Sequence, residues 1–156
     1  MPSLQIIAAS TSGHTDYVVT NVTIFLKTKV PNVSVTVIRA EQAKAEDLLK
    51  GDVLLLASGT WNTGGSEGQM NPHMHAFLRE RAADAKLKGK KVAIIGLGDA
   101  RYRYTAKAKD LLEEFVKSHG GELLLPSLKI VNEPYGQEEA IKKWAQELAK
   151  KISSHA

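Results

Sequence analysis

The stretch LQIIAASTSGHT, residues 4–15, shows the pattern on which the whole chain is built. Its first half, Leu4–Ala9, is an apolar run that predicts a buried strand, and its second half, Ser10–Thr15, is a hydroxyl-rich turn with one glycine. Apolar residues at helical spacing follow until Pro31, which ends the helix because proline has no N–H to donate. The stretch therefore predicts a strand, a polar turn and a helix in succession.

The same succession recurs along the rest of the chain. Further strands are predicted at residues 33–37, 53–57, 92–95 and 123–131. Helices are predicted between them, a short one at 48–49 and longer ones at 72–82 and 111–116. A last helix is predicted after the final strand, at 141–152. Five strands that alternate with helices predict an α/β fold, in which a parallel sheet is covered by helices on both faces.

The composition of each strand predicts its place in the sheet. The strand at 33–37 alternates valine with serine or threonine, and Pro126 interrupts the last strand, so both belong at edges. The continuous aliphatic runs at 53–57 and 92–95 belong in the middle. Right-handed crossovers then favour a doubly wound sheet of order 2-1-3-4-5. We expect one such domain over residues 1–156.

Length and composition exclude several classes of protein. The 156 residues fit one domain, and the absence of cysteine excludes a disulfide framework, a thiolate metal site and a thiol nucleophile. The 21 basic residues are spread evenly among 17 acidic ones, without the concentrated patch that nucleic acid requires. With no long apolar run and no export signal, we expect a cytoplasmic monomer that binds neither nucleic acid nor membrane. His73 and His75 point to different helix faces, so no metal site is expected.

Three polar loops follow the first, third and fourth predicted strands, at 10–15, 58–71 and 98–105. Sheets of this order bind ligands beyond the carboxyl ends of their strands. The first loop combines the free N–H groups of a helix N-terminus with four hydroxyls, and Gly13 lets the backbone approach a ligand. Because the loop has no lysine, it suits one phosphate monoester and not a nucleoside triphosphate. A capping turn is the alternative.

The other two loops carry aromatic residues outside any apolar stripe. Trp61 has no evident core to fill, unlike Trp144 on the last helix, and is predicted to stack on a planar ligand. Asp99 and Tyr102 offer an acceptor and a second aromatic ring, with Tyr104 as the alternative ring. Core packing for Trp61 and helix capping for Asp99 stay open. Together the loops predict a phosphate site beside two aromatic walls around a flat heterocycle.

These segments resemble the binding motifs of the flavodoxin family. Residues 10–15 are similar to its T/S-x-T/S-G-x-T motif, and 60–64 resemble P-T-W-N-x-G, with Gly59 in place of proline. Residues 96–102 resemble G-x-G-D-x-x-Y. The resemblance runs from residue 4 to about 150, without an insertion in the last strand, as in the short-chain group. It implies a flavodoxin-like, five-stranded parallel sheet and a noncovalently bound FMN.

The resemblance also implies which residues bind FMN. The phosphate would be held by Ser10, Thr11, Ser12, Gly13, His14 and Thr15, with a further hydrogen bond from Thr60. The ring would be contacted by Trp61, Asn62, Thr63, Gly64, Gly98, Asp99 and Tyr102. Trp61 and Tyr102 would enclose it, Asp99 would bond its pyrimidine edge, and the Asn62–Thr63 peptide would turn its carbonyl toward flavin N5 on reduction. His14 stands where the family usually has asparagine or lysine.

The function that the resemblance implies is that of an electron carrier, not an enzyme, with no catalytic residues. Such a carrier would shuttle single electrons at low potential, through the semiquinone/hydroquinone couple, from a reductase to an acceptor protein. The alternative is an FMN-dependent NAD(P)H:quinone or flavin reductase on the same scaffold, although no nicotinamide site is evident. A signalling receiver domain is excluded, because Ala8-Ala9-Ser10 and Ala57-Ser58 stand where its acidic residues belong.

The formal net charge of +4 departs from the acidic character of the family. Arg101, Arg103 and Lys107 flank the expected ring site, and we expect them to make the second reduction potential less negative than in acidic relatives. The charge also predicts either an acidic partner or docking that depends little on salt.

Overall fold

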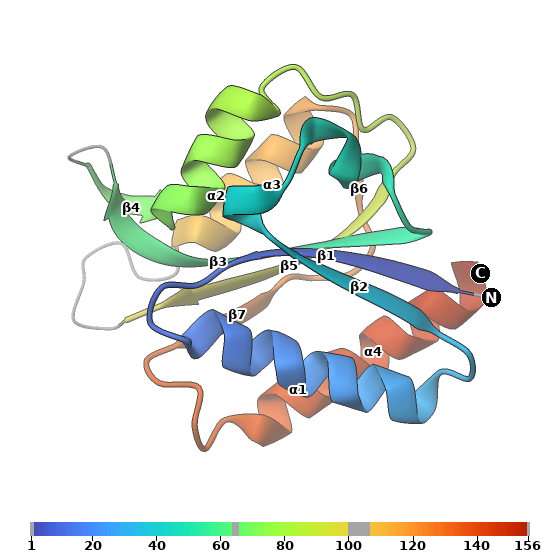
Figure 1. Cartoon of the computed structure of the whole chain (residues 1–156). Helices are drawn as coiled ribbons and strands as arrows, with labels where there is room; N and C mark the ends of the chain where they lie inside the picture. The colour runs from blue at the N-terminus through green and yellow to red at the C-terminus, as the bar shows by residue number, and fades with distance from the viewer. Residues whose placement is uncertain (1, 64–65, 100–106, 156) are drawn as a thin grey trace.

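The computed structural model describes residues 2–63, 66–99 and 107–155, whose strands form one twisted sheet between two layers of helices (Figure 1). The strands are β1 (Ser3–Ala9), β2 (Ser34–Arg39), β3 (Val53–Thr63), β4 (Ser66–Met70), β5 (Lys91–Gly98), β6 (Glu122–Leu123) and β7 (Leu128–Val131). The parallel part has the order β2-β1-β3-β5-β6, and β7 also pairs with β5. This confirms the predicted order, with the last predicted strand split on either side of Pro126.

Two pairs of helices cover the two faces of the sheet (Figure 1). One face carries α1 (His14–Lys29) and α4 (Glu138–His155), and the other carries α2 (Pro72–Ala76), its π-helical continuation η3 (Phe77–Arg81) and α3 (Lys107–Ser118). The connection from β2 to β3 contains two 3₁₀ turns, η1 (Ala40–Gln42) and η2 (Ala45–Leu49). The predicted α/β architecture is therefore confirmed.

The three central strands are buried on both faces, which explains their mainly apolar sequences; the buried Gln5 of β1 donates to the Asp47 carbonyl at 3.2 Å. Along β1, Ile6 and Ala8 belong to the core under α1 and α4, whereas Ile7 and Ala9 belong to the core under α2 and α3. Alternation between faces is the normal geometry of a strand, so a strand between two helical layers needs apolar residues on both faces. Trp144 lies in the first core, as predicted, and its indole N–H donates to the Pro126 carbonyl at 2.8 Å.

One feature of the sheet differs from the sequence prediction. The apolar run ends at Ala57 and predicts a loop from there to Asn71, but β3 continues to Thr63 because β4 folds back and pairs with it in antiparallel orientation. Thr60 lies opposite Met70, and Trp61 lies opposite Gln69. Asn71 then caps α2 by accepting a hydrogen bond from the His73 N–H at 2.9 Å, which confirms the predicted cap. This extension brings Trp61 to the end of the sheet.

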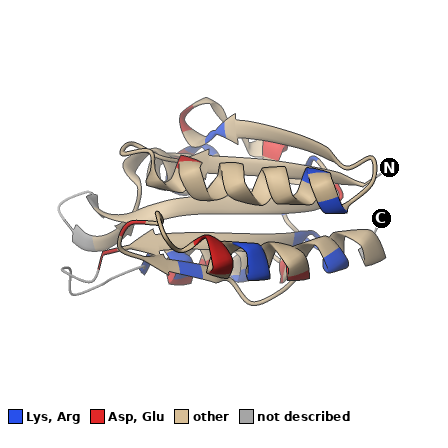
Figure 2. Cartoon of the chain, turned by 90° about the horizontal axis from the view of Figure 1, so that it is seen from below, with Lys and Arg blue, Asp and Glu red and all other residues tan. Residues whose placement is uncertain are grey.

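Charges of both signs share the face formed by α1 and α4 (Figure 2). Asp16 lies in the first turn of α1, and Lys27 and Lys29 lie in its last turn. Glu138 and Glu139 begin α4. Acidic first turns and basic last turns complement the helix dipoles, so these charges have a local structural role. Within the described ranges, no helix combines the length and the hydropathy needed to cross a membrane.

Asp47 holds the connection between β2 and β3. Its side chain is buried, and its carboxylate accepts a hydrogen bond from the Lys44 backbone N–H at 2.8 Å and pairs with the Lys50 ammonium at 3.0 Å. The backbone hydrogen bond, followed by the contact with Lys50, lowers the pKa of Asp47 below its ordinary value. A carboxylate whose pKa is lowered by folding stabilises the native state above the unfolded pKa, and this stabilisation is lost as the pH falls through the folded pKa.

We therefore predict that Asp47→Asn lowers the free energy of unfolding at pH 7, and that its difference from the wild type shrinks once the pH falls below about 4, where the unfolded carboxyl is protonated. Urea unfolding followed by circular dichroism at several pH values measures this difference. Asp84→Asn, at an exposed position, serves as the control and should change little at any pH. A difference between D47N and the wild type that stays constant down to acid pH would contradict the assignment.

Candidate functional site

The three segments predicted as loops begin at one edge of the sheet, where the parallel pairing of β1, β3 and β5 ends. The register places Ala9 beside Ser58 and Gly59 beside Leu97, so the residues that follow these positions are neighbours in space. Parallel strands bring their carboxyl ends to the same edge, and here the strand order reverses around β1 and β3. In the described residues, the starts of the three predicted segments therefore lie at one edge of the sheet, and ligand binding there stays a prediction.

The loop from Ser10 to Gly13 leads into an α1 N-terminus without a side-chain cap. Gly13 has φ +89°, in the left-handed region that favours glycine, and a Cβ there would meet no atom within 4 Å. The Ser10 hydroxyl accepts hydrogen bonds from the N–H groups of Gly13 at 3.1 Å and Asp16 at 3.4 Å, which fold the loop over the helix end. Thr11 and Ser12 are exposed. Apart from the Asp16 N–H, which donates to Ser10, a helix N-terminus without a cap from its own N-cap residue and beside exposed hydroxyls fits a phosphate group.

His14 belongs to an aromatic cluster that sequence reasoning did not identify. Its imidazole meets the Tyr135 ring edge-on at 5.6 Å, and Tyr135 also contacts the Tyr17 ring at 4.8 Å. The Tyr17 hydroxyl donates to Glu138 at 2.7 Å; this bond raises the pKa of Tyr17 and lowers that of Glu138. The cluster connects the first turn of α1 with the segment that enters α4. Tyr135, between Pro134 and Gly136, is an aromatic outside any apolar stripe, the same signal that identified Trp61.

Trp61 lies outside the core, at the same edge of the sheet as the N-terminus of α1. Its side chain is 40% exposed, which disagrees with the core-packing alternative. A Cβ added to Gly59 would lie 3.2 Å from Trp61 Nε1 and 3.9 Å from Thr15 Oγ1, so the indole lies against the Gly59 backbone, close to Thr15. The indole is therefore available at the same edge as the α1 N-terminus.

The remaining ring-contacting residues are described only in part. The pairing of β3 with β4 shifts register between Trp61 and Thr63, which places the Asn62–Thr63 peptide in an irregular part of the hairpin. Gly98 ends β5, its carbonyl accepts from the Asn132 N–H at 2.7 Å, and Asp99 follows it, half-buried. Lys107 begins α3 and pairs with Asp110. The residues Gly64, Arg101, Tyr102, Arg103 and Tyr104 lie outside the described residues.

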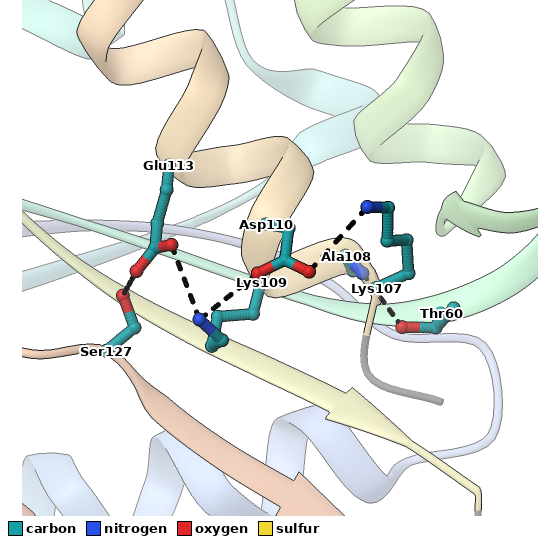
Figure 3. A network of polar contacts seen from close by, with 7 residues as sticks. All are labelled: Thr60, Lys107, Ala108, Lys109, Asp110, Glu113 and Ser127. Atoms are coloured by element: carbon teal, nitrogen blue, oxygen red, sulfur yellow. Dashed lines mark hydrogen bonds and ion pairs between the residues drawn. The ribbon is translucent and has the colours of Figure 1, made fainter. Parts of the chain in front are cut away.

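Thr60 has backbone partners on two other elements. Its hydroxyl donates to the Leu97 carbonyl of β5 at 2.8 Å. It also accepts from the Ala108 N–H of α3 at 3.0 Å, as Figure 3 shows. The Thr60 hydroxyl thus donates its only proton to the Leu97 carbonyl, and a hydrogen bond to a phosphate would need that same proton.

Comparisons with known proteins identify the family to which the chain is similar. The sequence model of the flavodoxin family matches residues 6–144. The flavodoxin of Maridesulfovibrio salexigens is 30% identical over 153 residues, which cover 97% of this chain and 100% of that protein. A probable flavodoxin 2 of Bacillus subtilis is 35% identical over 88 residues, 56% of this chain and 55% of that one. The structure of a short-chain flavodoxin associated with a bacterial microcompartment superposes with a TM-score of 0.82, at 26% identity and with coverage of 97% and 99%.

The family resemblance seen in the loop motifs is confirmed by these matches, and so are the short-chain length and the predicted cofactor. The site described above places the N-terminus of α1 and an exposed tryptophan at one edge of the sheet. The chain belongs to the flavodoxin family, and it is an FMN-containing electron carrier and not an enzyme.

Proposed function

We propose that this flavodoxin carries electrons one at a time and at low potential between redox proteins, with FMN bound across the edge formed by β1, β3 and β5. The observation that supports this most is that the exposed Trp61 indole and Thr15, in the first turn of α1, both lie close to Gly59 at this edge. FMN supplies the redox chemistry when bound. The protein's part is to bind the phosphate, orient the ring and limit its contact with water.

The phosphate is proposed to bind at residues 10–15. The N–H groups of the first turn of α1 have no acceptor within the helix, and the helix dipole favours an anion there. The hydroxyls of Thr11 and Ser12 are exposed beside this turn, and Thr15 lies buried at its base. Ser10 organises the loop through its two backbone hydrogen bonds, and Gly13 leaves the approach open. His14, held by Tyr135, would form one side of this site.

The isoalloxazine ring is proposed to lie between Trp61 and Tyr102. Asp99 would accept from the ring N–H groups at the pyrimidine edge, and Gly98 would keep the backbone of β5 close to the ring. The Asn62–Thr63 peptide would face flavin N5, next to Gly64. What supports these roles is the parallel pairing of β3 with β5, which continues up to Gly59 and Leu97. Thr60 and Trp61 therefore follow this pairing at the same edge where Gly98 and Asp99 follow it.

An absorption spectrum and two titrations test the proposal. The purified protein should show flavin bands with about one FMN per chain, since the fold has one such edge. The apoprotein should bind FMN far more tightly than riboflavin, which lacks the phosphate, because the α1 N-terminus contacts only the phosphate. A colourless protein that binds neither flavin would refute the proposal, and equal affinities would refute the phosphate site.

A reductase on the same scaffold is the competing function, and one assay separates the two. A carrier needs a second protein to reduce it, whereas a quinone or flavin reductase oxidises NAD(P)H by itself. We expect the protein with FMN to leave NADPH unconsumed until a flavodoxin reductase is added. Steady NADPH oxidation by the protein alone would favour the enzyme.

The proposed partners are a reductase as donor and a low-potential acceptor protein, met by a cytoplasmic monomer. At the site edge the described charges are mixed: Asp16 pairs with Arg39 at 2.9 Å, Lys107 pairs with Asp110, and Glu138 is exposed. Such an edge gives little steering by charge, so the rate of reduction by a flavodoxin reductase should change little with ionic strength. Stopped-flow measurements from low to high salt test this, and a steep fall in rate with added salt would contradict it.

A further inference from the structure

Thr60 lies where β3, β5 and α3 come together. Its hydroxyl hydrogen-bonds the Leu97 carbonyl, one residue before Gly98, and the Ala108 N–H, at the second position of α3. These partners are 37 and 48 residues away along the chain, and both are buried. The first N–H groups of a helix have no acceptor within the helix, so Thr60 serves Ala108 as a cap donated by another element. One side chain thus joins three elements at the proposed flavin edge.

The hydroxyl of Thr60 has no second proton to give. A threonine hydroxyl carries one donor and two acceptor positions, and here the donor is used by Leu97 and one acceptor by Ala108. A phosphate offers only acceptors at its ionised oxygens, so it needs a donor. Binding a phosphate through this hydroxyl would therefore leave the buried Leu97 carbonyl without its partner.

The α3 side of this junction is held in place independently of Thr60. A Cβ on Gly96 would lie only 2.6 Å from Lys109 Cβ, so α3 packs directly on the β5 backbone. The Lys109 ammonium contacts Asp110 at 3.2 Å and Glu113 at 3.3 Å, and Glu113 accepts from the Ser127 hydroxyl at 2.6 Å (Figure 3). The Ala108 N–H is consequently presented to Thr60 from a fixed helix end.

We infer that Thr60 is a positioning residue for the flavin ring and not a ligand of its phosphate. By joining β3 to β5 and α3, its hydroxyl sets the spacing between Trp61, the next residue on β3, and Gly98 and Asp99, which follow Leu97. This spacing is that of the slot in which the ring is proposed to lie, so the inference rests on the proposed FMN site.

Affinities for two flavins test this inference, because FMN and riboflavin share the ring and differ in the phosphate. Thr60→Val keeps the shape of the side chain and removes both hydrogen bonds. We expect it to lower the affinities for FMN and for riboflavin by the same factor, about tenfold, so that the ratio of the two affinities is unchanged. Thr60→Ser keeps the hydroxyl and should bind both flavins like the wild type. Thr36→Val, at an exposed position of the edge strand β2, is the matched control and should also change neither affinity.

Hydrogen exchange of the apoprotein gives a second readout without flavin. In T60V the Ala108 amide should exchange faster than in the wild type and in T36V, because its acceptor is gone. T60A takes the place of T60V if the valine variant does not fold.

The inference is overturned if the variant without the hydroxyl loses affinity for FMN but not for riboflavin, since that identifies a phosphate ligand. It is also overturned if both affinities stay the same while only the free energy of unfolding falls, or if Ala108 exchange is unchanged. A wild-type protein that binds neither flavin refutes the proposed function instead, and the exchange at Ala108 then still tests the junction itself.

Discussion

Gly96→Ala should lower the free energy of unfolding by about 3 kcal/mol, the upper part of the usual range for overpacking a buried site. A Cβ at this position would lie 2.6 Å from Lys109 Cβ, 2.7 Å from its backbone nitrogen and 2.8 Å from its Cα. Atoms at such distances repel strongly, and two of the three belong to the backbone of α3. The helix must therefore move away from β5, and the Ala108 N–H moves with it, away from Thr60.

Two controls separate this contact from other effects of replacing a glycine. Gly89→Ala places a Cβ where no atom lies within 4 Å, but at φ +78°, so it should cost only the backbone strain of about 1–2 kcal/mol. Lys109→Ala in the G96A background removes the lysine stem but leaves the backbone atoms and Cβ of residue 109 in place, and it should not restore stability. Urea unfolding of the four proteins measures these differences. A G96A protein as stable as the wild type, or a full rescue by K109A, would contradict the close packing of α3 on β5.

The parallel sheet could be predicted from the sequence because its strands need apolar residues on both faces. The runs Leu4–Ala9, Val53–Ala57 and Val92–Ile95 are buried between two layers of helices, so burial leaves a continuous signal in each. The edge strand β2 could also be predicted, because its exposed face carries polar residues. The break at Pro126 could be predicted because proline cannot donate a hydrogen bond to a neighbouring strand. These signals are local, and the strand order follows from them.

The hairpin of β3 and β4 could not be predicted in the same way. Its residues are polar or glycine over most of its length, and they pair with each other beyond the parallel sheet, where no apolar face is required. The π-helical turn at Phe77–Arg81 was also missed. It is marked by the bond from the Ala82 N–H to the Phe77 carbonyl, whereas the apolar residues at 74, 77, 78 and 82 suit an ordinary helix as well.

In the candidate site, the sequence predicted which segments meet but not which partners their side chains take. The loop after β1 and the tryptophan after β3 stand out as polar and aromatic interruptions of apolar patterns. The partners of Thr60 are separated from it by 37 and 48 residues, and the contact of His14 with Tyr135 joins opposite ends of the chain. Such pairings depend on the final spacing of the helices and strands. A sequence motif can therefore identify a functional residue but not the partner with which its side chain interacts.

Trp61→Ala should weaken FMN binding by about 30- to 100-fold, because the ring loses both a stacking partner and the apolar surface that the indole buries against it. Titration of the apoprotein, followed by the fluorescence of FMN, measures the dissociation constant. Riboflavin should lose affinity by the same factor, since it has the same ring. Stability should change little, because the indole is 40% exposed and has no place in either core.

Trp144→Phe provides the matched control with the only other tryptophan of the chain. The Trp144 side chain is 9% exposed and donates to the Pro126 carbonyl, so its replacement should lower the free energy of unfolding by about 1–2 kcal/mol through the lost hydrogen bond and volume. Its effect on the FMN dissociation constant of the folded protein should be small, because Trp144 lies in the core under α1 and α4, whereas the flavin edge lies beyond the strand ends. Trp61→Phe keeps an aromatic face and should retain most of the affinity that W61A loses. If W61A bound FMN like the wild type, or if W144F lost as much affinity as W61A, the flavin ring would have to lie away from Trp61, and the slot between β3 and β5 would need another occupant.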